Sequence, residues 1–248
     1  MSMRIPKLRL WPVLKSMSVL LVTAGLIACA GTPANEDDPL EKFNRSMFAV
    51  NRFGDKVFYR PIGKAYKTVV PSFARKGVYN FFDNLTTPRS AMNNFLQGKP
   101  ARGFNEITRF LFNSTLGVGG LFNVAAAGGM QRYDEDFSQT LAVWGLPEGP
   151  YVVVPIWGPR SMLSTVALPV DFFTDAQRLI EDKRTRDILY VLRLIDGRSR
   201  LLTTEELLNK SQDPYIAYRE AFLQNRQFNI YDGDPPDDEE IYFFDEAE

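Results

Sequence analysis

Apolar residues recur with helical spacing along most of the chain after residue 37. The first run comprises Leu40, Phe43, Met47, Val50, Phe53 or Gly54, and Val57, with Lys42, Arg45, Arg52 and Lys56 between its members. This pattern predicts an amphipathic helix of about five turns with a basic polar face. Asp38 is expected at its N-cap, with Pro39 in the first helical position and Glu41 completing a capping box.

Further helices are predicted along the rest of the chain. They span residues 73–85, 89–96, 101–116, 133–144, 159–167, 171–195, 203–208 and 211–228. Thr86-Thr87-Pro88 and Gly98-Lys99-Pro100 are expected to separate the second, third and fourth helices, because proline ends or interrupts a helix. Asp182 and Arg186 are expected to pair one turn apart. The short connections imply that the helices fold back on one another.

One stretch departs from helical spacing. Val152, Val153 and Val154 form a short β-branched run between turn-forming residues. Such a run predicts a strand or a β-hairpin, the one non-helical element of the chain. The candidate residues of the hairpin turn are Gly145, Gly149, Pro150 and Tyr151.

The first 28 residues are typical of an export signal. Four basic residues precede an uncharged run, 16–28, that is too short to span a membrane as a mature helix. Leu26, Ile27, Ala28 and Cys29 resemble the lipobox of bacterial lipoproteins, in which cleavage between Ala28 and Cys29 leaves the cysteine as an acylated amino terminus. An ordinary secretory signal that contains a cysteine is the alternative. Ala30, where sorting rules for lipoproteins would place Asp for retention, favours the outer membrane.

The remaining chain divides into three parts. Residues 29–37 are small and polar and are expected to form a tether, residues 38–230 a single helical domain, and residues 231–248 an acidic, disordered tail. The aromatic residues at 241–244 within that tail are expected to dock on the body or on a partner. The composition, 45% hydrophobic and 13% aromatic, is rich for a water-soluble chain.

Composition also restricts the chemistry. The chain has no histidine, which excludes a Ser-His-Asp triad, a Cys-His pair and imidazole metal sites. Its single cysteine excludes an intramolecular disulfide. Asp134, Glu135 and Asp136 are the nearest carboxylate cluster for a lipid hydrolase, but they also suit the first turn of a helix. We expect no enzyme activity, metal or cofactor, and no nucleic acid as a partner.

Several strings, taken in order, resemble the MlaA (VacJ) family of Gram-negative outer-membrane lipoproteins. They are DPLEKFNR at 38–45, NNFLQG at 93–98, TRF at 108–110, NSTLGVGG at 113–120, GPY at 149–151, VP at 154–155 and SQDPY at 211–215. The chain departs from the family at Ser164-Thr165, where relatives tend to carry Arg-Asp. Any ion pair made by that Arg-Asp is therefore in doubt here.

The resemblance implies an all-α, ring-like bundle of short amphipathic helices embedded in the periplasmic leaflet of the outer membrane. It further implies that an amphipathic channel removes phospholipids from the outer leaflet and passes them to a soluble periplasmic carrier, beside a trimeric porin. Asn44, Arg45, Arg52 and Arg109 are the candidate residues of that pathway, because guanidinium groups bind phosphate. A structural lipoprotein that tethers porins or cell wall is the alternative.

Overall fold

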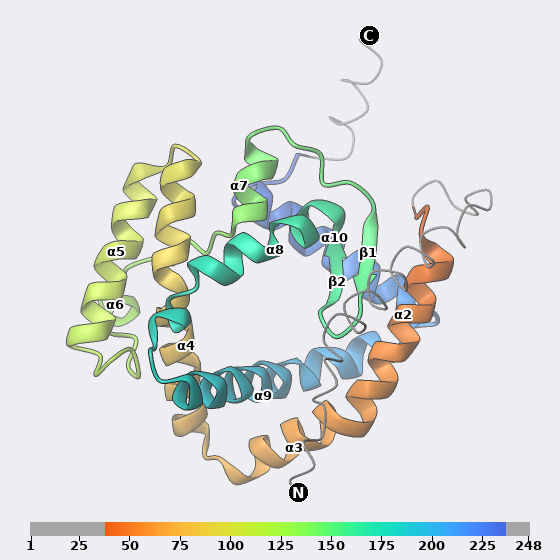
Figure 1. Ribbon diagram of the computed structural model, residues 1–248, viewed down its shortest axis with the longest axis horizontal. Helices are drawn as coiled ribbons and strands as arrows, with labels where there is room; N and C mark the ends of the chain where they lie inside the picture. Colours follow the sequence, from red (N-terminus) through yellow and green to blue (C-terminus); the bar gives the residue numbers. More distant parts are fainter. Residues whose placement is uncertain (1–37, 237–248) are drawn as a thin grey trace, which may run out of the picture.

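The computed structural model describes residues 38–236 and arranges most of their elements in a ring (Figure 1). The elements are α2 (Glu41–Gly54), the π-helical turn η1 (Asp55–Tyr59), α3 (Arg60–Val69), α4 (Ser72–Leu96), α5 (Pro100–Thr115), α6 (Val124–Ala127), α7 (Phe137–Val143), β1 (Tyr151–Val154), β2 (Gly158–Ser161), α8 (Met162–Thr174), the 3₁₀ turn η2 (Ala176–Leu179), α9 (Lys183–Leu208) and α10 (Pro214–Ile230). The prediction of a helical fold with one hairpin is confirmed. Ala28, Cys29 and the predicted tether lie outside the described residues.

The ring is built from packed helix pairs. The long helix α4 packs against α5 on its outer side, and α9 packs against α3 and α4. Helix α7 packs against α8, and the hairpin contacts α2, α8 and α10. Within residues 38–236, no helix is both long and apolar enough to cross a membrane.

At the start of the described chain, the carboxylate of Asp38 is buried and does not cap helix α2. Helix α2 begins at Glu41, with Leu40 at its N-cap and no side-chain capping bond. Asp38, expected at that cap, is 1% exposed. It accepts hydrogen bonds from Asn44 Nδ2 at 3.0 Å and from the Tyr215 hydroxyl. The predicted cap is therefore wrong, because the contacts to α2 and α10 place Asp38 in the interior.

Proline does not interrupt α4, although a break at Thr86-Thr87-Pro88 was expected from the sequence. The helix runs through Pro88 for 25 residues. The hydroxyls of Thr86 and Thr87 donate to the Asp83 carbonyl oxygen at 2.7 and 3.2 Å, one turn before the proline. These bonds and the packing of α4 on α5 hold the backbone helical where the proline lacks its N–H.

The boundaries around α9 also differ from the sequence pattern. The predicted helix 171–195 is split, because α8 ends at Thr174 and the turn η2 follows it. Asp182 accepts the Thr185 N–H at 2.7 Å and so caps α9. From there α9 continues to Leu208 and includes the segment 203–208 that was expected to form a separate helix.

The two strands form an antiparallel hairpin that α2 holds from one side. Tyr151 pairs with Ser161 and Val154 with Gly158, so residues 155–157 connect the strands. Gly145, Gly149 and Pro150 precede β1, and Tyr151 is its first residue. The predicted turn residues thus lie in or beside the connection from α7 to β1. Gly145 and Gly149 adopt positive φ angles, which are typical of glycines in turns. This signal marks a turn, but it does not tell whether the turn precedes β1 or connects β1 to β2.

Two asparagines of α2 bind the hairpin through its backbone. Asn44 is 0% exposed. Its Nδ2 donates to the Tyr151 carbonyl oxygen at 3.0 Å, and its Oδ1 accepts the Val153 N–H at 2.8 Å. Asn51, which is partly exposed, bonds the Val154 carbonyl oxygen at 3.0 Å and the Ile156 N–H at 2.8 Å in the same way.

A small apolar cluster lies next to this junction. Tyr151, Val153 and Tyr215 are buried there, with Met47, Phe48, Phe222 and Leu223 packed against them. The Tyr151 and Tyr215 rings meet edge to face, with centroids 6.3 Å apart. The cluster therefore joins α2, β1 and α10 in one place.

On the opposite side of the ring, a buried polar seam joins α4, α5 and residues 130–136. Asn94 Nδ2 donates to the Tyr133 carbonyl oxygen at 3.2 Å, and Glu106 Oε1 accepts the Tyr133 N–H at 2.8 Å. Arg109 Nη1 donates to the Met130 carbonyl oxygen at 2.6 Å. The two helices thus hold an extended segment with side chains that bond its backbone.

Burial of Glu106 in this seam costs free energy, because its carboxylate is 0% exposed. Burial raises its pKa to about 6, since a low-dielectric environment disfavours the charged form. The Tyr133 N–H and the Arg109 guanidinium, with Arg109 Nε 3.7 Å from Glu106 Oε1, offset part of that effect.

The described start of the acidic tail contacts the body. Asp232 forms ion pairs with Lys99, at 2.7 Å between Nζ and Oδ2, and with Arg102. These contacts lower the pKa of Asp232 against the opposing effect of its burial. The tail thus begins on the basic N-terminal turn of α5, and its remaining residues lie outside the described part of the chain.

The Asn44→Ala variant should lower the free energy of unfolding by about 3 kcal/mol, because it leaves buried backbone groups of β1 without partners. Asn51→Ala is the matched control. It removes the same kind of paired bond at a partly exposed position, where water can replace the amide, and should cost about 1 kcal/mol. Denaturant unfolding in a non-ionic detergent measures both, and equal losses would contradict the structural role of Asn44.

The raised pKa of Glu106 predicts a pH dependence of stability. An acid whose pKa is higher in the folded state destabilises the fold as pH rises between the unfolded and folded values. The wild type should therefore lose about 2 kcal/mol from this group between about pH 4.5 and pH 6. Glu106→Gln should remove that loss, whereas the exposed Glu206→Gln should retain it. Unfolding curves with the same pH slope in Glu106→Gln and wild type would disprove it.

Candidate functional site

The interior of the ring wall is polar. Among residues 38–236 the buried side chains are mainly polar or charged, and few large apolar side chains are fully buried. The residues at 0% exposure are Asn44, Ser90, Asn93, Asn94, Glu106, Thr140 and Gln177. A water-soluble domain of this size normally buries apolar side chains instead. These polar groups are held by hydrogen bonds, such as the one from Thr140 Oγ1 to Asn93 Oδ1 at 2.8 Å.

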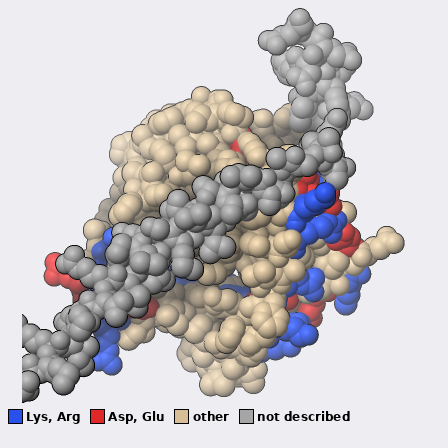
Figure 2. Space-filling view, turned by 45° about the vertical axis from the view of Figure 1, so that its right-hand side comes forward, with Lys and Arg blue, Asp and Glu red and all other residues tan. Residues whose placement is uncertain are grey.

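The exterior is correspondingly apolar. Large exposed side chains occur on most elements, among them Phe53, Phe58, Phe104, Phe112, Phe173 and Leu179, with exposures from 45% to 82%. Figure 2 shows broad uncharged areas on one face, with Lys, Arg, Asp and Glu gathered toward its edges. Exposed apolar surface of this extent marks contact with a membrane or a partner. Its distribution over successive amphipathic helices suits a protein that lies in a membrane interface.

A pocket of about 200 Å³ lies where α2, the hairpin, α9 and α10 come together. We call it the Arg52 pocket. Its apolar lining includes Phe48, Val153, Leu201 and Leu208, and its charged lining is Arg52, Asp55, Arg198 and Glu205. Apolar and charged groups therefore face the same space, as a ligand with a charged head and hydrocarbon chains requires.

The two arginines of this pocket differ in whether a carboxylate neutralises them. Arg198 bonds Asp55, with Nη2 2.6 Å from Oδ2, and also bonds Glu205. These hydrogen bonds raise the pKa of Arg198 against the opposing effect of burial. Arg52 has its guanidinium carbon 5.5 Å from the centroid of the Phe48 ring and makes no ion pair with any described carboxylate. Arg52 is thus the lining cation that remains available to an anion.

The four predicted pathway residues do not share one cavity. Only Arg52 lines the Arg52 pocket. Asn44 bonds β1, and Arg109 bonds the segment after α6. Their part in a lipid pathway stays a prediction.

Arg45 connects α2 to the start of α10. Its guanidinium lies 2.8 Å from Asp213 Oδ2 and 2.7 Å from Glu41 Oε1, and it stacks 4.4 Å from the centroid of the Tyr215 ring. Hydrogen bonds to Asp213 and Glu41 raise its pKa. The SQDPY string therefore has a structural meaning, since Asp213 both caps α10 and receives this arginine.

Sequence reasoning missed the capping box at the start of α8. Ser164 and Ser161 form a capping box at the start of α8, with both bonds at 3.0 Å, and Thr165 Oγ1 donates to the Ser161 carbonyl oxygen at 2.9 Å. Ser164 and Thr165, noted only as a departure from the family, thus organise the helix start. The spacing from Ser161 to Ser164 was a detectable but weak signal.

The carboxylates at 134–136 have separate structural roles. Asp134 accepts the Ser90 hydroxyl at 2.9 Å, and Glu135 accepts Gln97 Nε2 at 2.9 Å. Asp136 caps α7, which begins one residue later, in a capping box with Gln139. The predicted helix start at 133 is therefore too early by four residues. No group of three or more His, Cys, Asp or Glu in the described residues could hold a metal.

Comparison with known proteins shows relatives over most of the chain. The sequence model described as "MlaA lipoprotein" matches residues 36–229. The "Intermembrane phospholipid transport system lipoprotein MlaA" of Escherichia coli (strain K12) is 35% identical over 222 residues, which cover 87% of this chain and 88% of the relative. The protein of the same name from Haemophilus influenzae is 31% identical over 234 residues, 89% and 93% of the two chains.

The fold has a solved counterpart. A structure described as "Structural basis for maintenance of bacterial outer membrane lipid asymmetry" aligns with a TM-score of 0.69 and 36% sequence identity, covering 78% of this chain and 98% of that one. The aligned share is close to the share of the chain that the structure describes. The family match and these relatives show that this chain belongs to the MlaA lipoprotein family.

Proposed function

We propose that this protein removes phospholipids from the outer leaflet of the outer membrane and so maintains the lipid asymmetry of that membrane. The observation that carries the proposal is the inverted distribution of side chains, polar inside the ring wall and apolar outside. The relatives named for intermembrane phospholipid transport support the same function.

The Arg52 pocket is the part of the pathway that the described residues define best. A phospholipid needs a cation near its phosphate and apolar groups along its tails. Arg52 supplies the cation, while Phe48, Leu201 and Leu208 supply apolar contacts. Arg198 is already neutralised by Asp55 and Glu205, so it shapes the wall without competing for phosphate. Lipid would move along a gradient of affinity, with no covalent bond made or broken.

The proposal also covers how the protein is attached to the membrane and which proteins it works with. Acyl chains on Cys29, joined through residues 29–37, would hold the ring at the periplasmic leaflet, and exposed side chains such as Phe53 and Phe173 would enter the hydrocarbon. A trimeric porin would receive part of the apolar exterior, and a soluble periplasmic carrier would accept the lipid. The family resemblance supports both partners.

Loss of the gene should allow phospholipid to accumulate in the outer leaflet, measured by surface labelling of intact cells. Wild-type protein should reverse the accumulation, and Cys29→Ala should not, because the variant lacks its acyl anchor. If loss weakened cell shape or porin assembly without phospholipid in the outer leaflet, the protein would be a structural tether instead.

Filling the Arg52 pocket should block transport without unfolding the protein. Thr204 lines this pocket and is exposed, so Thr204→Trp places a large side chain in it. Thr203→Trp is the matched control, because Thr203 is the exposed neighbour on α9 that does not line the pocket. Thr204→Trp should fail to clear surface-labelled phospholipid, whereas Thr203→Trp should clear it. Equal clearance at equal protein levels would remove the pocket from the pathway.

A further inference from the structure

A second pocket, of about 250 Å³, lies at the corner between α3 and α4, where α9 packs against both helices. We call it the Lys67 pocket. Its lining is Lys67, Ser72, Arg75, Lys76, Asp196, Ser199 and Arg200. Four of these side chains are cationic and one is a carboxylate, so the pocket has a net positive charge. None of its lining residues belongs to the Arg52 pocket.

The single carboxylate of the Lys67 pocket is already engaged. Asp196 Oδ2 lies 2.8 Å from Arg200 Nε, and its Oδ1 accepts the Tyr66 hydroxyl at 3.2 Å. Arg200 is further fixed 3.9 Å from the centroid of the Tyr79 ring. Among the residues that the structure describes, the other cations of the pocket have no carboxylate partner.

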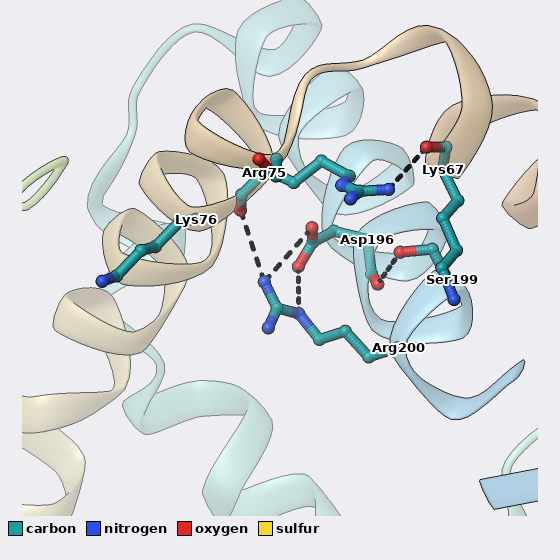
Figure 3. Close-up of a pocket in the computed structure, with 7 residues that line it drawn as sticks. Lys67, Arg75, Lys76, Asp196, Ser199 and Arg200 are labelled. Atoms are coloured by element: carbon teal, nitrogen blue, oxygen red, sulfur yellow. Dashed lines mark hydrogen bonds and ion pairs between the residues drawn. The ribbon is translucent and has the colours of Figure 1, made fainter. Parts of the chain in front are cut away.

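Three lining cations, Lys67, Arg75 and Lys76, have no carboxylate partner among residues 38–236. Arg75 has one guanidinium nitrogen 2.5 Å from the Lys67 carbonyl oxygen, which holds its side chain across the corner (Figure 3). Lys67 and Lys76 have ammonium groups with no hydrogen bond or ion pair among the described residues. In Figure 3 the Lys67 side chain runs toward Ser199, whereas the Lys76 side chain extends away from the other lining side chains.

The start of α4 adds backbone donors to this charge. Pro71 is the N-cap and provides no side-chain bond, and the first backbone bond of the helix runs from the Arg75 N–H to the Pro71 carbonyl oxygen. The N–H groups of the first turn before Arg75 therefore have no acceptor within the helix. The N-terminus of a 25-residue helix favours an anion. Charge and backbone dipoles thus select the same type of ligand.

Apolar side chains beside the pocket identify the source of that anion. Val69, at the end of α3, is 78% exposed, and Phe73, next to Ser72 in the first turn of α4, is 79% exposed. A site for free phosphate would not need such neighbours, whereas a lipid places hydrocarbon directly beside its phosphate. Basic groups with adjacent exposed apolar groups are the arrangement by which proteins bind anionic membrane surfaces.

We propose that the Lys67 pocket binds the phosphate of an anionic phospholipid headgroup, while Val69 and Phe73 contact the acyl chains. The site would seat a lipid at the α3–α4 corner of the ring, outside the Arg52 pocket. The proposal rests on the proposed function only in placing the protein within a phospholipid membrane.

Calorimetric titration of the full mature protein in a non-ionic detergent tests the site. The probes are dihexanoylphosphatidylglycerol and inorganic phosphate. Lys67→Gln with Lys76→Gln should weaken binding of the lipid by about fivefold or more, since two unpaired charges are lost. Lys42→Gln with Lys210→Gln removes two exposed lysines outside the pocket and should leave the affinity unchanged. Unchanged lipid affinity in the first variant would overturn the proposal.

Two further comparisons separate the ligand sources and the two pockets. Val69→Ser with Phe73→Ser should weaken lipid binding but leave any binding of inorganic phosphate as it was. Phosphate bound as tightly as the lipid would show an anion site without lipid selectivity and overturn the headgroup assignment. The lipid titration of Lys67→Gln with Lys76→Gln is repeated in the Thr204→Trp variant, whose Arg52 pocket is filled. A fivefold or larger loss that persists there assigns the binding to the Lys67 pocket, whatever the outcome of the transport experiment. A loss that disappears there would overturn the separate site.

Discussion

A polar group that is removed from water is costly to leave without a hydrogen-bond partner, and this constraint organises much of the ring. Glu106 and Asn44 are both fully inaccessible, and each bonds backbone groups of a segment far away in the chain. An unpaired buried group would cost about 1–3 kcal/mol, so each such side chain accepts few alternative arrangements. Because hydrogen bonds require particular directions, they restrict the ring wall to fewer arrangements than apolar packing alone would allow.

The same constraint explains why the apolar residues are outside. With α4, α5 and the segment after α6 joined by polar side chains, the apolar faces of these helices have no interior to occupy. Phe104 and Phe112 on α5 are examples, at 64% and 45% exposure. In water such a surface would favour association with other molecules, whereas contact with hydrocarbon would bury it. If the protein lies in the membrane as proposed, the hydrophobic effect acts between the protein and that membrane more than within the protein.

The arginines and lysines fall into two groups that differ in their partners. Arg45, Arg109 and Arg198 bond carboxylates or backbone carbonyl groups and connect separate elements. Arg52 and Lys67 line pockets and have no carboxylate partner among the described residues. A cation that is already paired gains little from a phosphate, whereas an unpaired one beside apolar groups can gain a charge-assisted bond. The local partners, and not the residue type, thus separate structural cations from candidate lipid contacts.

The sequence by itself determined the helical class, the position of the valine-rich strand and the family, because these depend on spacing and on ordered local strings. It also singled out Arg52, which lines the pocket. Tertiary structure decided what local signals could not. Asp38 is a buried hydrogen-bond acceptor and not a cap, and Pro88 lies within a continuous helix. Partners far away in the chain determine both outcomes, and the Lys67 pocket likewise exists only because α9 packs against α3 and α4 at their corner. Periodicity records which face of an element is apolar, but not which distant group satisfies a buried polar atom.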